Sequence, residues 1–185
     1  MESLPRPRDL EQPVGFMARE LAEHLGEPAV VEICVDLLRG ADRTDHLEAL
    51  RFLAGRSFDP GDQALDPAVW KDYWVRTWGA RGLLYVWDES ASGPVIDGLG
   101  DAEWRPAEMC LKVATRHEVG GAGDGAETLS RHELPRVRAQ ALRALGAIGD
   151  TEHVEAVRER LDDESPDVRR QAARALDRLT ERLDL

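Results

Sequence analysis

Four basic side chains recur along the chain at a fixed interval. Arg81, Lys112, Arg143 and Arg174 stand 31 residues apart. Side chains that repeat in this way line up on one face of a repeating structure, and a row of cations attracts carboxylates and phosphates. The spacing therefore predicts a surface that could hold an acidic peptide, a phosphate-bearing ligand or a nucleic acid single strand.

The elements that position these residues are helices. Apolar or small residues stand at i, i+4, i+7, i+8 and i+11 in each copy, except for His117 at the last position of the copy from Pro106; this spacing places them on one side of a helix. A period of about 31 residues built from helical phrases predicts stacked helix pairs. Small residues in the middle of each apolar side predict close helix approach. The phrases are VRTWGARGLLYV from Val75, PAEMCLKVATRH from Pro106, VRAQALRALGAI from Val137 and VRRQAARALDRL from Val168.

The predicted fold is all-α, a right-handed α-solenoid of about five antiparallel helix pairs. Residues 1–12, rich in proline and charge, are predicted to be flexible, and residues 13–185 to form a single domain. Within that domain, 13–67 is a degenerate N-terminal part with a loop or broken helix at 55–67, and 68–185 holds the regular repeats. The predicted helices cover residues 14–25, 28–38, 44–54, 68–87, 92–99, 105–119, 124–131, 134–148, 151–161 and 166–183.

The pattern resembles the HEAT-like repeats, in particular the short repeats named after phycobilisome lyases. The phrases SPDVRRQAARALDRL and LPRVRAQALRALGAIGD carry the resemblance, and DYWVRTWGARGLLY and WRPAEMCLKVATRH match more loosely. The resemblance covers residues 68–185 and implies that the VRxxAxxAL helix is the second of each pair and lines a concave surface. Pro106–Ala107 departs from the usual Val–Arg pair, which makes the entry turn of that copy less certain.

The face opposite the apolar side is the predicted binding surface, here called the basic strip. Eight of its sixteen positions are basic and one is acidic, in a chain of net charge −12. Arginine is a good helix former, so a merely solvated face is the competing interpretation. The strip comprises Trp74, Trp78, Arg81, Tyr85, Arg105, Met109, Lys112, Arg116, Arg136, Gln140, Arg143, Ala147, Asp167, Gln171, Arg174 and Arg178. We expect all of these residues to contact a partner except Ala147, Asp167, Gln171 and Arg178.

Tryptophan gives a second signal. Trp70, Trp74 and Trp78 recur every four residues, which predicts one side of a single helix, and all five tryptophans lie within residues 70–104. A cluster of this kind is typical of a partner-binding hot spot. The alternative is that the rings cover the core beside the irregular loop at 55–67; for Trp87 and Trp104 we favour that alternative.

The predicted function is a non-enzymatic scaffold or adaptor that holds a protein or acidic peptide in the concave groove. The alternative is a nucleic-acid-binding or DNA-glycosylase-like repair protein, in which Asp72, Trp74, Trp78 and Arg81 would imitate the family's cleft. The net charge disfavours nucleic acid and anionic lipid. A lyase-type subunit for a tetrapyrrole is implied by the family name alone.

No catalytic residue, metal site or cofactor is expected. The histidines lack zinc spacing, and GGAGDG at 120–125 lacks the Lys-Ser/Thr of a phosphate-binding loop. Cys34 and Cys110 lie far apart in apolar phrases and are expected to be reduced thiols. Without a signal core or an apolar run of membrane-spanning length, the chain is expected to be cytoplasmic. The oligomeric state is left open.

Overall fold

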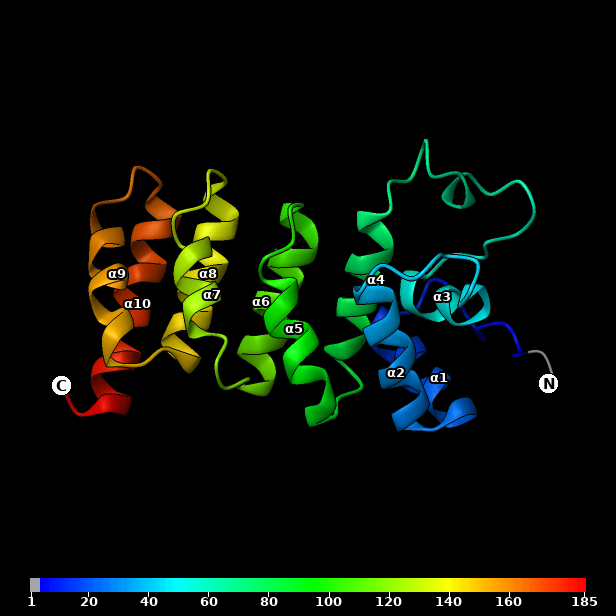
Figure 1. Ribbon diagram of the computed structural model, residues 1–185, viewed down its shortest axis with the longest axis horizontal. Coiled ribbons are helices and arrows are strands. Elements are labelled where there is room, and N and C mark those ends of the chain that lie inside the picture. Colours follow the sequence, from blue (N-terminus) through cyan, green and yellow to red (C-terminus); the bar gives the residue numbers. More distant parts are fainter. Residues whose placement is uncertain (1–3) are drawn as a thin grey trace. The chain divides into compact units, whose positions relative to one another are not determined.

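Helices are the regular elements of this chain: the computed structural model describes residues 4–185 and has ten α-helices and no strand in them (Figure 1). Contacts divide the chain into two compact units, Met1–Pro94 and Val95–Leu185. The single domain predicted for 13–185 stays a prediction. Within residues 4–185, no helix combines the length and apolarity that a membrane crossing requires.

The first unit is built from four helices around one apolar core. α2 packs against α4, and α1 packs against both α2 and α3. Met17, Leu21, Leu37, Phe52 and Leu83 are among its fully buried side chains. The bounds are α1 Val14–Leu25, α2 Glu27–Leu38, α3 Leu47–Ala54 and α4 Tyr73–Leu83, with short 3-10 turns at Gln63–Leu65 and Glu89–Ala91.

Two glycines of α4 set the distance between α4 and α2. A Cβ placed on Gly79 would lie 2.6 Å from the Cys34 carbonyl oxygen and 2.7 Å from the Leu38 nitrogen. A Cβ on Gly82 would overlap the Cys34 sulfur. The predicted role of small residues in close helix approach is therefore confirmed here.

The predicted helix over 68–87 is wrong at both ends, because α4 begins only at Tyr73 and ends at Leu83, after which residues 84–86 form a turn. Residues before α4 form turns, in which the Asp66 carboxylate accepts the Ala68 N–H at 2.8 Å. The buried Arg43 guanidinium donates to the Trp70 carbonyl at 2.8 Å and to the Asp72 carboxylate at 2.5 Å. Trp70 thus lies outside the helix that carries Trp74 and Trp78.

Residues 4–12 are irregular and contact the first unit through polar groups. The Leu4 N–H donates to the Glu48 carboxylate at 3.0 Å, and Arg6 pairs with Asp59 at 2.7 Å. The Arg8 N–H donates to Glu20 at 3.2 Å. The rest of the segment predicted to be flexible, residues 1–3, lies outside the described residues.

The second unit repeats one arrangement. α8 packs against α6 on one side and α10 on the other, while the shorter α7 and α9 pack on α8 and α10 (Figure 1). The core columns predicted from the period, such as Val137, Ala141 and Leu145, are fully buried. The bounds are α5 Ser92–Gly98 (which spans the unit boundary), α6 Trp104–His117, α7 Gly123–Leu129, α8 Pro135–Ile148, α9 Val154–Glu159 and α10 Pro166–Leu183, with 3-10 turns at Thr151–His153 and Arg160–Asp162.

Both cysteines are free thiols in the core. Burial raises the pKa of Cys34 to about 12. Burial and the nearby Asp101 charge also raise the pKa of Cys110. Because the thiolate is the reactive form, we expect neither thiol to react with a disulfide reagent in the native protein and both to react after unfolding in urea. Rapid stoichiometric labelling of native protein would contradict this.

Candidate functional site

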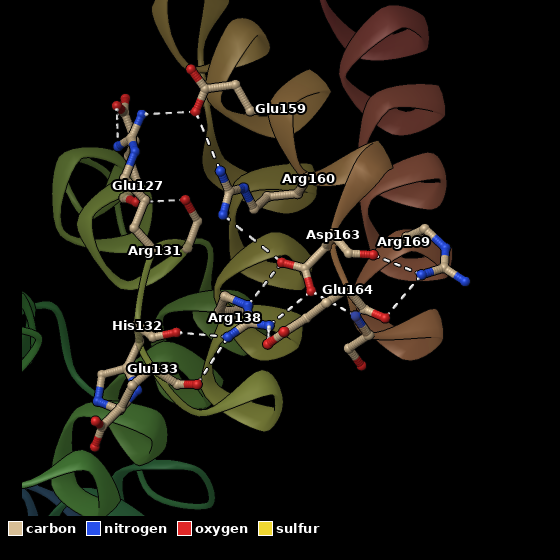
Figure 2. A network of polar contacts seen from close by, with 12 residues as sticks. Glu127, Arg131, His132, Glu133, Arg138, Glu159, Arg160, Asp163, Glu164 and Arg169 are labelled. Atoms are coloured by element: carbon tan, nitrogen blue, oxygen red, sulfur yellow. Dashed lines mark hydrogen bonds and ion pairs between the residues drawn. The ribbon is translucent and has the colours of Figure 1, made fainter.

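Each of the last two long helices is held at its entrance by an arginine of its first turn. Arg138 of α8 donates to the carbonyls of His132 and Glu133, at 3.0 and 2.9 Å. Arg169 of α10 donates to the carbonyls of Asp163 and Glu164, at 2.7 and 3.1 Å. The two sets of residues stand one 31-residue period apart, and Figure 2 shows both contacts. In the copy at α6, Ala107 replaces the arginine and cannot make this contact.

A buried ion pair joins these two copies. Asp163 and Arg138 are both nearly inaccessible, and the carboxylate accepts Nε and Nη2 of Arg138 at 2.9 and 2.8 Å (Figure 2). Burial raises the pKa of Asp163, but hydrogen bonds from Arg138 and the Ser165 N–H, and the charges of Arg138 and Arg160, outweigh it and hold the pKa below its usual value. This network positions α8 and α10, the helices that carry the C-terminal end of the basic strip.

The side chain three residues before the start of each of α6, α8 and α10 accepts the same kind of hydrogen bond. Asp101, His132 and Asp163, each 31 residues from the next, accept the backbone N–H two residues on, at 2.8, 3.0 and 2.9 Å. The imidazole Nδ1 of His132 takes the place of a carboxylate oxygen. His132 therefore has a structural role in the turn.

The N-terminal end of the strip lies in the first unit and is occupied by structural contacts. Trp78 is buried, and its ring meets Phe58 edge-on at 5.6 Å, so the core interpretation holds for this tryptophan. Trp74 is half-buried, with ring centroids 5.2 Å from Trp70 and 6.3 Å from Trp78. Tyr85 is half-buried and contacts Gly15 of α1.

Arg81 does not present a free cation. Its guanidinium donates from Nε and Nη2 to the Leu53 carbonyl in the last turn of α3. Burial lowers its pKa. The residues proposed to imitate a glycosylase cleft thus have other partners: Asp72 pairs with Arg43, Trp78 lies in the core, and Arg81 caps α3.

The middle of the strip gathers around one buried carboxylate and one indole. Glu108 pairs with Lys112 at 3.4 Å and accepts a two-pronged contact from Arg136 at 2.9 Å. The guanidinium carbons of Arg105 and Arg136 lie 4.2 and 4.7 Å from the Trp104 ring centroid, within the range of cation–π attraction. Glu108 and Trp104 therefore engage these cations before any partner arrives. Met109 is half-buried on the same helix.

At the C-terminal end, the strip borders a hollow of about 190 Å³ between α8 and α10, with Thr115 of α6 on its rim. Arg143, Arg174 and Arg178 line it, all exposed. Among residues 4–185, Arg143 bonds only to the Gln140 amide oxygen, at 3.0 Å, and Arg174 and Arg178 have no ion-pair partner. Arg116 is also exposed and unpaired within that range. This is the part of the strip whose positive charge remains available.

Two residues that line the hollow, Gln171 and Arg178, were left out of the expected contact set. The 31-residue period contained the signal for Gln171, since it places Gln171 one copy after Gln140. The described residues hold no group of three potential metal-ligating side chains. The site can therefore be described as a cationic hollow that is also lined by the Gln171 side chain and by Gly146.

Comparison with known families decides what these copies are. The sequence model of the HEAT repeat family matches residues 126–185, the span that contains α8, α9 and α10. Residues 126–185 are therefore similar to the HEAT repeats. This matched span contains both arginine contacts at the helix entrances, the Asp163–Arg138 pair and the helices that form most of the hollow.

Solved structures extend the likeness in fold beyond the matched HEAT repeats. One crystal structure of an engineered protein is 18% identical, with a TM-score of 0.57 over 93% of this chain and 86% of that chain. A second engineered protein is 16% identical, with a TM-score of 0.53 over 92% and 99% of the two chains. Together with the HEAT repeats, these likenesses confirm the predicted all-α solenoid class. A comparison with curated proteins found no match.

Proposed function

We propose that this protein is a non-enzymatic binding scaffold whose HEAT repeats hold an acidic segment of a partner protein. The observation that carries the proposal is the contrast along the basic strip. Arg81, Lys112 and Arg136 are already engaged, whereas Arg143, Arg174 and Arg178 surround a hollow and have no carboxylate partner among residues 4–185.

The electrostatic setting supports an acidic partner. The whole chain carries a net charge of −12, so a local group of unpaired cations is a distinct feature of its surface. The hollow's rim is cationic, although Glu118 and Glu181 line a neighbouring hollow that shares Gly146 and Arg178. Arg143 and Arg174 line only the first hollow. Opposite charge would steer a carboxylate-rich segment onto this face.

The test is binding of a fluorescently labelled pool of glutamate-rich peptides, measured by anisotropy at low and moderate salt. We expect saturable, salt-sensitive binding to the wild type. Reversing two rim charges, with Arg143→Glu and Arg174→Glu together, should weaken binding by about tenfold or more, because attraction becomes repulsion.

The matched control is Arg19→Glu with Arg39→Glu. Both arginines are exposed in the first unit, and neither has an ion-pair partner within residues 4–185, so the control changes the net charge equally. It should bind like the wild type. Equal loss in both double variants would show that net charge alone drives association and would overturn the proposal. Tight binding of single-stranded DNA, with none of the peptides, would instead favour the nucleic-acid alternative.

A further inference from the structure

The side chain of Gln171 carries an observation that the proposed function does not use. Gln171 is 7% exposed and lines the hollow beside Arg174. No hydrogen-bond partner of its amide is found among residues 4–185. The amide of a side chain this buried usually bonds to another group of the protein or to water.

The equivalent residue one repeat earlier shows what this amide lacks. Gln140 is 5% exposed, and its amide oxygen accepts Nη1 of Arg143 at 3.0 Å. Gln171 and Arg174 have the same spacing in sequence but make no such bond. Within the described range, the fully buried side-chain nitrogen or oxygen atoms that lack a partner belong to Arg56 and Arg160. The amide atoms of Gln171 also lack a partner but are not among them, so these atoms are not fully buried and remain accessible from the hollow that Gln171 lines.

We infer that this hollow binds a phosphate group, carried on a phosphorylated side chain of the partner that the proposed scaffold holds. The inference rests on the proposed function and adds the chemistry of the group at its centre. Arg143, Arg174 and Arg178 supply guanidinium N–H donors, and the Gln171 amide supplies a further donor at the wall.

The number and type of donors distinguish a phosphate from a carboxylate. A guanidinium carries five N–H donors. Three guanidinium groups and an amide therefore offer more donors than the roughly four lone-pair positions on the two oxygens of one carboxylate can accept. A phosphate monoester presents three acceptor oxygens and about −1.5 to −2 charges at neutral pH. Arginine clusters that surround such a group form short, charge-assisted bonds.

The experiment compares three labelled peptide pools of random flanking sequence that differ only in the central residue: phosphoserine, glutamate or serine. Anisotropy is measured with the wild type and with Gln171→Leu, a near-isosteric change that removes the amide and no charge. We expect the wild type to bind the phosphoserine pool about fivefold or more tighter than the glutamate pool, as a doubled charge and a third acceptor oxygen would give. Gln171→Leu should reduce that preference, because one donor to the phosphate is lost while the arginines remain, and should keep its affinity for the glutamate pool.

The outcomes separate this inference from the function on which it rests. Equal binding of the phosphoserine and glutamate pools, lost in the Arg143→Glu, Arg174→Glu protein, would overturn the phosphate site and leave the acidic-partner scaffold standing. Binding of neither pool would overturn both. Inorganic phosphate is added as a competitor, and the Gln171 side-chain amide is followed by NMR. A saturable shift of that signal supports the site, and its absence at concentrations that displace the phosphoserine pool places binding elsewhere.

Discussion

Replacing Asp163 with alanine is expected to lower the free energy of unfolding of the second unit by about 3–5 kcal/mol. The substitution removes the acceptor of two Arg138 bonds and of the Ser165 N–H. It leaves the Arg138 charge, itself only 6% exposed, with the exposed Glu164 as its remaining acidic contact at 3.2 Å. Urea unfolding gives the size of the loss, and hydrogen exchange of α8 and α10 locates it.

The neighbouring Asp162 offers a matched control, because it is exposed and makes no ion pair within residues 4–185. Asp162→Ala should change stability by about 0.5 kcal/mol or less. An unfolding midpoint for Asp163→Ala equal to that of Asp162→Ala would show that the buried pair contributes nothing to stability.

The same pair has a defined pH dependence. Since the folded-state pKa of Asp163 lies below its ordinary value of 3.8, its contribution is fully present above that value and is lost as pH falls through the folded-state pKa. The stability difference between the wild type and Asp163→Asn should therefore shrink as pH is lowered from 7 toward 3. A difference that stays constant over this range would exclude the ionised carboxylate as its source.

Gly79→Ala is expected to lower the free energy of unfolding of the first unit by about 3 kcal/mol or more, at the upper end of overpacking effects. The new Cβ would lie 2.6 and 2.7 Å from backbone atoms of Cys34 and Leu38, which cannot rotate away as a side chain can. α2 and α4 would have to separate along their main contact. The gain in helix propensity, about 1 kcal/mol, is too small to offset this. Thermal unfolding followed by circular dichroism measures the change.

Gly93 provides the comparison, because it also lies in a helix and a Cβ there meets nothing within 4 Å. Gly93→Ala should leave stability unchanged or raise it by up to about 1 kcal/mol. If Gly79→Ala were tolerated as well as Gly93→Ala, the close approach of α2 and α4 would not limit the size of the side chain between them.

Most of the helices could be predicted from the sequence. Residues that face the core must be apolar or small, and these positions repeat every 31 residues. Val137, Ala141 and Leu145 of α8 are buried as their spacing indicates. The N-terminal end of α4 was missed for a different reason. Trp70 lies outside that helix, and its carbonyl accepts a hydrogen bond from Arg43, which is 27 residues away in the sequence. No local pattern reveals such a contact.

The candidate site was predictable in position but not in charge balance. The period placed Arg81, Arg143 and Arg174 in one column, yet Arg81 caps α3 whereas Arg174 has no ion-pair partner within residues 4–185. The difference comes from a carbonyl 28 residues distant, which periodicity does not encode. The column of Arg138 and Arg169 was visible in the same period, but its binding to the preceding turn was not anticipated.

The arginine contact at the entrance of α8 and α10 has a consequence for how such a chain changes length. Each arginine donates to carbonyls only five and six residues before it, so both partners of the contact belong to the same copy. Duplicating or deleting one whole 31-residue segment would therefore duplicate or delete the complete contact. Adding or removing complete copies would therefore preserve this contact, and the specific interaction left to match at a new junction would be a pair such as Arg138–Asp163, which joins two copies.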